Sequence, residues 1–187
     1  MRLYLPEELG PDGYPAEWHL TIKHDVLEAA GHRCVRCLHP YRNGEHGRGE
    51  WSPCDGRCRH GGPARVDGRD PGPGFGDVLT DIAAGVDHGM VIEAQWRVLT
   101  VHHLDGNKAN CRWWNLAALC QRDHLLIQGK VILDRPWPWE HSEWFRPYVA
   151  GYYALVYLGE ELTREEATAR LDELLSLERQ ATLGGAA

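Results

Sequence analysis

The chain has 187 residues, of which 43% are hydrophobic and 25% are charged, a balance that excludes a chain disordered along its whole length. The formal net charge of −7 excludes a surface covered in positive charge, although one local basic surface is compatible with it. No stretch approaches the ~20 consecutive apolar residues that span a bilayer, and the N-terminus lacks a signal peptide's apolar run. We therefore expect no membrane partner and a cytoplasmic protein.

The first expected elements are an arm and a short helix. Residues 1–20 contain three Pro and two Gly among aromatic residues, which predicts an irregular arm. From Thr21 to Ala30 apolar residues recur at helical spacing, and Gly31 follows as a stop signal. This pattern predicts a short helix that leads to Cys34.

An insertion follows at about residues 39–95. Residues 39–76 are rich in Gly, Pro and Arg and have little apolar periodicity, which predicts a long loop. Residues 77–95 are weakly apolar, and their pattern fits a helix or a strand equally well. Because a structureless loop of this length is uncommon unless it is functional or held by a metal, its cysteines matter.

A strand, a turn, a second strand and a helix are expected between residues 96 and 131. Residues 96–101 are rich in β-formers, Asp105-Gly106-Asn107 is a strong turn signal, and residues 115–120 are a second apolar run. Residues 121–131 can form the helix. We assign residues 21–135 to one central domain that includes the insertion.

Residues 136–187 are predicted to be a C-terminal helical extension. Ser142 can cap a first helix, although Pro147 limits its first turn and Gly151 weakens its middle. Thr163 and Glu166 form a capping box for a second helix. That helix has an apolar stripe, which is more typical of core packing than of a partner site: Ala167, Leu171, Leu174, Leu175 and Leu177.

Three histidines and one asparagine carry the chemical signal of the chain. His102 and His103 are adjacent at a strand end, where alternation sends their side chains to opposite faces, and His124 lies early in the expected helix. Asn115 stands twelve residues after His103 and nine before His124. Together with Leu-Asp-Gly-Asn after the His pair and Asn-Leu-x-x-Leu-Cys before the last His, this order resembles the HNH nuclease family.

The resemblance implies a small α+β fold with a ββα-metal core and an endonuclease activity. It implies that His102 and His124 bind a catalytic divalent ion (Mg²⁺, Mn²⁺ or Zn²⁺), that His103 is the general base, and that Asn115 orients the loop or the base. Some members have a further ligand one turn after the last His, where this chain has Gln128. Independently of the family, a neutral His can take a proton from water near physiological pH, and a divalent ion can stabilise phosphodiester hydrolysis.

The six cysteines favour metal binding over disulfides in a reducing compartment. Cys34 and Cys37 form a C-x-x-C knuckle, which the family pairs with a second knuckle near the final strand. Cys120 is present there, but Asp123 stands where the family usually has Cys. Because Asp can also ligate zinc, we expect a structural Zn²⁺ on Cys34, Cys37, Cys120 and Asp123.

The insertion offers three further metal ligands, Cys54, Cys58 and His60. One of them could replace Asp123, or they could build a second zinc site; the alternative is that the thiols are ordinary. Cys111 has no partner at useful spacing and is expected to be a free thiol.

Positive side chains gather near the histidines in the sequence. The expected phosphate contacts are Lys108, Arg112, Arg122 and Lys130, joined by Arg97 and by arginines between residues 33 and 69. Trp113 and Trp114 either stack on a base or pack within the hairpin. We expect a DNA substrate, with RNA as the second candidate.

Two further hypotheses remain open. A catalytically silent zinc-binding module with the HNH fold could bind nucleic acid or protein without turnover, although the presence of His103 argues against it. The C-terminal helices offer a surface for a homodimer or for assembly into a larger effector complex.

Overall fold

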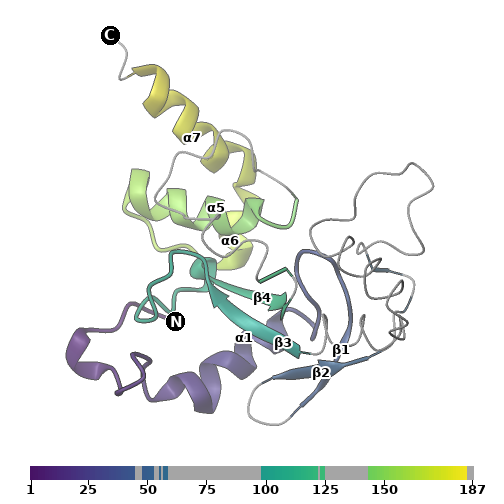
Figure 1. Cartoon of the computed structure of the whole chain (residues 1–187). Coiled ribbons are helices and arrows are strands. Elements are labelled where there is room, and N and C mark those ends of the chain that lie inside the picture. Colours follow the sequence, from purple (N-terminus) through teal and green to yellow (C-terminus); the bar gives the residue numbers. More distant parts are fainter. Residues whose placement is uncertain are drawn as a thin grey trace, which may run out of the picture. The chain divides into compact units, whose positions relative to one another are not determined.

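The computed structural model describes residues 1–44, 48–52, 55, 57–58, 98–121, 123–124 and 143–184. The chain divides into two compact units. Unit 1 comprises Met1–Pro15, His103–Ala117 and Val131–Ala187, and unit 2 comprises Ala16–His102 and Ala118–Lys130. The fold is α+β, as predicted, with a four-stranded antiparallel sheet and several helices (Figure 1).

The strands follow one another in the sheet in the order of the sequence. They are β1 (Tyr41–Asn43), β2 (Gly49–Trp51), β3 (Val98–His103) and β4 (Leu116–Cys120), in the order β1-β2-β3-β4. β1 pairs antiparallel with β2, and β2 pairs antiparallel with β3, with Gly49 opposite Leu99. The turn between β3 and β4 begins as predicted, and Gly106 there has a φ of 74°, a conformation that glycine adopts without strain.

The hairpin of β1 and β2 corrects the prediction of an irregular loop over residues 39–76. Tyr41 is buried while Arg42 is exposed, so β1 contributes one side chain to the core. At Gly49 a Cβ would come within 2.7 Å of the Leu99 Cβ and 2.9 Å of the Tyr41 Cβ. The glycine therefore lets β2 fit between its neighbours. Nearly all of the remaining insertion, including residues 77–95, lies outside the described residues.

The predicted helix before the cysteine knuckle is confirmed, although it begins earlier than expected. A π-helical turn, η2 (Trp18–Ile22), leads directly into α1 (Lys23–Ala29). Trp18 is buried one turn before Ile22, so its ring extends the apolar face into the segment predicted as the arm. Gly31 ends the helix with a φ of 59°, in the left-handed region that favours glycine.

Unit 1 contains the C-terminal helices. They are α5 (Arg146–Tyr153), its π-helical continuation η5 (Ala154–Leu158), α6 (Arg164–Ala169) and α7 (Leu171–Gly184). The predicted capping box is confirmed, because Glu166 N donates to Thr163 Oγ1 at 3.2 Å and Thr163 N donates to Glu166 Oε2 at 2.7 Å. The single helix predicted after Thr163 is two helices, with a break at Arg170.

The apolar stripe of the last two helices forms part of the core of unit 1. Its buried centre consists of Ala150, Ala154, Ala167 and Leu174. Partly buried side chains pack around this centre: Trp113, Leu162, Leu171 and Leu177. The stripe is therefore core packing. None of the helices in the described part of the chain has both the length and the apolar character needed to cross a membrane.

The N-terminal arm, residues 1–15, also belongs to unit 1 and contains one 3-10 turn, η1 (Pro6–Glu8). Its backbone is tied to the loop that follows the turn after β3. Tyr4 N donates to the Ala109 carbonyl at 2.9 Å, and Cys111 N donates to the Arg2 carbonyl at 3.0 Å. The arm is irregular, as predicted, but it is anchored by this pairing.

Candidate metal centre and catalytic residues

Unit 2 contains a buried cluster of four metal-ligating side chains. Cys34 and Cys37 come from the knuckle after α1, Cys120 ends β4, and Asp123 lies in the helical turn that follows. One ligand atom from each of these residues lies within 4.8 Å of all the others. The sequence predicted these four residues, and the structure brings them together.

The distances within the cluster fit a tetrahedral ion. Cys37 Sγ lies 3.9 Å from Cys120 Sγ. Asp123 Oδ2 lies 3.1 Å from Cys34 Sγ and 3.4 Å from Cys120 Sγ. Tetrahedral zinc, with Zn–S near ~2.3 Å and Zn–O near ~2.0 Å, separates two sulfurs by ~3.8 Å and a sulfur and an oxygen by ~3.5 Å. The four groups can therefore hold one metal ion with little movement.

Backbone hydrogen bonds hold the knuckle in place. Cys34 N donates to the His39 carbonyl at 3.1 Å, and Leu38 N donates to the Cys34 carbonyl at 2.8 Å. Val35 N donates to the Ala118 carbonyl at 2.9 Å, which joins the knuckle to β4 two residues before Cys120. The first two ligands are thus placed against the strand that carries the third.

Arg36, between the two knuckle cysteines, contacts the four-residue cluster, which sequence reasoning did not indicate. Its Nη1 lies 3.2 Å from Asp123 Oδ1, on the carboxylate oxygen that does not face the sulfurs. Burial, with the neighbouring Cys34, raises the pKa of Asp123 to about 6, and Arg36 acts against this rise. Burial also opposes ionisation of Cys34, but hydrogen bonds from Cys120 and Cys37 lower its pKa well below the ordinary value. Arg36 therefore supports an ionised carboxylate among thiols.

His102 and His124, the predicted ligands of a catalytic ion, lie together in unit 2. Their ring centroids are 4.4 Å apart at an interplanar angle of 55°. His102 is half-buried on β3, and His124 stands in the helical turn after β4. Burial lowers the pKa of His124, which favours the neutral ring that binds metals. Thr100 contacts this pair, since its Oγ1 lies 3.5 Å from His124 Nδ1.

His103, the predicted general base, is described within unit 1. It follows His102 in β3, where burial alternates along the strand, and only 6% of it is exposed. Burial lowers the pKa of His103 to about 4. The negative charge of Asp105 and a hydrogen bond to the Lys108 carbonyl act against this shift, whereas the positive charge of Lys108 adds to it. The Tyr14 ring lies 5.8 Å from the His103 ring, centroid to centroid. The imidazole is therefore neutral at physiological pH and held on two sides.

Asn115 is fully buried and fastens the loop after β3. Its Oδ1 accepts from Asp105 N at 2.8 Å. Its Nδ2 donates to Asp105 Oδ1 and to the Asn110 carbonyl, each at 2.7 Å. All three contacts act on the loop that supplies the Lys108 carbonyl to His103. Asn115 thus has the geometry of an orienting residue.

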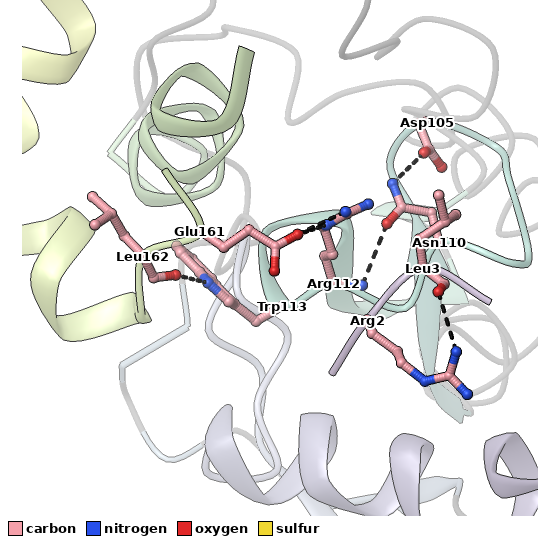
Figure 2. A network of polar contacts seen from close by, with 8 residues as sticks. All are labelled: Arg2, Leu3, Asp105, Asn110, Arg112, Trp113, Glu161 and Leu162. Atoms are coloured by element: carbon pink, nitrogen blue, oxygen red, sulfur yellow. Dashed lines mark hydrogen bonds and ion pairs between the residues drawn. The ribbon is translucent and has the colours of Figure 1, made fainter. Parts of the chain in front are cut away.

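A polar network continues from this loop to the segment between η5 and α6 within unit 1 (Figure 2). Asn110 Nδ2 donates to Asp105 Oδ2 at 2.7 Å. Arg112 donates from Nε and Nη2 to Glu161 Oε1 at 2.8 and 2.7 Å, and Trp113 Nε1 donates to the Leu162 carbonyl at 2.8 Å. Trp113 is therefore a packing residue of unit 1.

Two of the described candidates for phosphate contacts already have partners inside unit 1. Arg112 is paired with Glu161. Lys108 Nζ donates to the Asp12 carbonyl at 2.9 Å and lies 4.4 Å from the centre of the Tyr14 ring. Of the arginines predicted between residues 33 and 69, Arg33 pairs with Asp55 and Arg36 pairs with Asp123. The other described ones are exposed: Arg42, Arg48 and Arg57. Arg97, Arg122 and Lys130 lie outside the described residues.

The additional cysteines occupy different places. Cys58 is not a member of the four-residue cluster; its Sγ lies 3.7 Å from His39 Nδ1, a contact that the sequence did not indicate. Cys54 and His60 lie outside the described residues. Cys111 is buried in unit 1 and is not part of a disulfide, and its Sγ lies 3.7 Å from the Lys108 carbonyl oxygen. Comparisons with protein-family models, with curated proteins and with solved structures gave no match, so the residues themselves carry the functional argument.

Proposed function

We propose that the chain is a metal-dependent HNH endonuclease with a ββα-metal core that hydrolyses phosphodiester bonds of DNA. The observation that carries this proposal is the paired rings of His102 and His124, 4.4 Å apart, with His103 next to His102 in the same strand. Two imidazoles on facing elements suit a divalent ion, and the adjacent one suits a general base.

His102 and His124 would hold Mg²⁺, Mn²⁺ or Zn²⁺, which polarises a phosphoryl oxygen and stabilises the charge on the leaving oxygen. His103 takes the proton of the attacking water. One of its ring nitrogens donates to the Lys108 carbonyl, which leaves the lone pair of the other nitrogen for that proton. Asn115 keeps the loop that carries this carbonyl in place.

The cluster of Cys34, Cys37, Cys120 and Asp123 would hold a structural Zn²⁺. Three thiols and one carboxylate in a closed, buried, tetrahedral arrangement are typical of structural zinc, since soft sulfur ligands favour it over Mg²⁺ or Ca²⁺. We therefore expect zinc at the cluster, whichever divalent ion the histidine pair binds.

A plasmid assay tests the proposed function. Zinc-loaded protein is incubated with supercoiled DNA and Mg²⁺, Mn²⁺ or added Zn²⁺, and nicked product is measured. We expect wild-type protein to nick DNA and His103→Ala to be slower by ~100-fold or more, because the base is lost. His19→Ala, at an exposed histidine, is the matched control and should cut as wild type does. RNA of the same sequence tests the second candidate substrate.

Two results would contradict the nuclease proposal: no cleavage by wild-type protein with any of these ions, or full activity of His103→Ala. The second candidate function, a silent zinc-binding module, is favoured by the low exposure of His103 and by the internal pairing of Lys108 and Arg112. It predicts that wild-type protein shifts labelled DNA in a gel or captures a protein without producing cut strands.

A further inference from the structure

A second pair of metal-ligating side chains lies in unit 2, outside the four-residue cluster. His39 is fully buried, and its Nδ1 lies 3.7 Å from Cys58 Sγ. A nitrogen and a sulfur on one tetrahedral zinc ion, with Zn–N of ~2.0 Å and Zn–S of ~2.3 Å, are separated by ~3.5 Å. The pair therefore already has the spacing of two ligands of one ion.

The His39 ring is held in a fixed orientation. It packs edge-on against Tyr41, with ring centroids 5.0 Å apart and an interplanar angle of 74°. Tyr41 begins β1 and is itself buried. The imidazole is thus locked by the strand that follows the knuckle, as is usual for a histidine that binds a structural metal.

The segment that carries Cys58 is fastened to the same knuckle. Arg33 Nη1 donates to the Leu38 carbonyl at 2.9 Å, and the Arg33 guanidinium forms an ion pair with Asp55. Asp55 Oδ1 also accepts from Arg57 N, one residue before Cys58, at 3.1 Å. Cys58 is therefore brought to His39 by contacts that do not depend on the thiol itself.

A simple hydrogen bond between thiol and imidazole would give a similar distance, so other observations must decide between the two explanations. The strands that border the insertion, β1 and β2, have only three residues each, and β1 lies at the edge of the four-stranded sheet, beside β2. A bound ion beside such a short edge strand stabilises the folded arrangement, because metal binding is coupled to folding. A fully buried imidazole beside a thiol at the base of such a hairpin fits a metal better than a lone hydrogen bond does.

We propose that His39 and Cys58 are ligands of a second zinc ion, distinct from the ion on Cys34, Cys37, Cys120 and Asp123. A mixed nitrogen and sulfur donor set selects zinc among the abundant divalent ions. The ion links His39, just after the knuckle, to Cys58 further along the insertion. This proposal does not depend on nuclease activity.

The test is the zinc content of the purified full-length protein. His102→Ala serves as the parent, so that the histidine pair does not add to the count. After dialysis against a weak chelator, elemental analysis should find about two zinc ions per parent chain and about one after His39→Asn or Cys58→Ser. Cys37→Ser should lose the other ion. His19→Asn and Cys111→Ser, which change a histidine and a cysteine elsewhere, should keep both.

Cobalt gives a second measurement on the unaltered ligands, in case a variant does not fold. Titration of metal-free parent protein with Co²⁺ should develop thiolate charge-transfer absorption over about two equivalents if both sites exist, and over about one if only the four-residue cluster binds. One zinc ion per parent chain, unchanged zinc content in folded His39→Asn or Cys58→Ser, or saturation at one equivalent of Co²⁺ would each overturn the proposal.

Discussion

Thr100 determines which nitrogen of His124 is available to a metal ion. Its hydroxyl donates to the Leu119 carbonyl at 3.4 Å, and its Oγ1 lies 3.5 Å from His124 Nδ1. A hydroxyl has one hydrogen, so with that hydrogen given to Leu119 the oxygen can only accept from Nδ1–H. The lone pair of His124 is then on Nε2. A contact of this kind fixes the tautomer and the ring orientation of a metal-binding histidine.

We therefore predict that Thr100→Val, which keeps the shape of the side chain and removes the hydroxyl, weakens metal binding at the histidine pair by ~10–100-fold. Thr100→Ser should restore most of the affinity. The measurement is calorimetric titration of zinc-loaded protein with Mn²⁺, and the retained zinc serves as the control for folding. If Thr100→Val binds Mn²⁺ as tightly as wild type, the hydroxyl has no role in the site.

The residues of the candidate site differ in how far the sequence could reveal them. His102, His103, Asn115 and His124 were found through their spacing, because each belongs to one short segment in which order alone carries information. His39 and Arg36 were not found, because their importance comes from partners far away in the chain. A buried histidine and a salt-bridged arginine have no periodicity that separates them from others of their kind.

Gly151 in α5 looks unfavourable from sequence, because glycine in a helix interior costs about 1 kcal/mol relative to alanine. The structure explains its presence. A Cβ at this position would lie 2.6 Å from Trp113 Cζ2 and 2.8 Å from Trp114 Cβ, so the helix packs directly on the tryptophan turn η4 (Trp113–Asn115). The ring of Trp113 is fixed there by its hydrogen bond to the Leu162 carbonyl. Glycine lowers the helix propensity, but the absence of a Cβ allows the helix to approach the tryptophan turn closely.

We predict that Gly151→Ala destabilises the protein by about 1–3 kcal/mol, the usual range for overpacking, although alanine is the better helix former. The difference between Arg179→Gly and Arg179→Ala, at an exposed interior position of α7, measures the propensity contribution separately and should be about 1 kcal/mol. Both values come from urea unfolding followed by circular dichroism. An increase in stability of Gly151→Ala would mean that the tryptophan turn can move away.

At the level of elements, local signals were predicted well and long-range ones were not. The helix over residues 23–29 and the capping box at Thr163 depend on residues within a few positions of each other. The hairpin of β1 and β2 was missed because three-residue strands are too short to show alternation, and the space at Gly49 is set by Leu99, fifty residues away. The break between α6 and α7 at Arg170 was not predicted, because no proline or glycine marks it in the sequence.

Both units contain buried apolar side chains, and unit 2 also contains the four-residue cluster of metal-ligating side chains. Unit 1 has an apolar centre formed by Ala150, Ala154, Ala167 and Leu174, and none of its described contacts uses a metal ligand of the cysteine cluster. In unit 2 the ligands come from segments 83 to 89 residues apart, joined at Cys37 with Cys120 and at Cys34 with Asp123. Such distant segments are expensive in chain entropy to bring together, and a bound ion stabilises their closure.

Removal of the metal should therefore loosen unit 2 first. With a strong chelator, amide hydrogen exchange followed by mass spectrometry should show at least about a tenfold loss of protection in peptides containing Val35 and Leu38, whose amides donate to the Ala118 and Cys34 carbonyls. Peptides containing Ala167 and Leu174, whose amides bond within the C-terminal helices, should keep their protection.

Added Zn²⁺ should restore the first set, and added Mg²⁺ should not, because Mg²⁺ binds thiolates poorly. Equal loss of protection in both sets would mean that the chain opens as one cooperative unit whose stability depends on the metal throughout. Unchanged protection at Val35 and Leu38 would mean that hydrogen bonds among the thiols and Asp123 hold the knuckle closed without an ion. Only the selective, zinc-reversible loss matches a fold in which unit 2 depends on a bound metal ion in addition to its buried apolar side chains, while unit 1 does not.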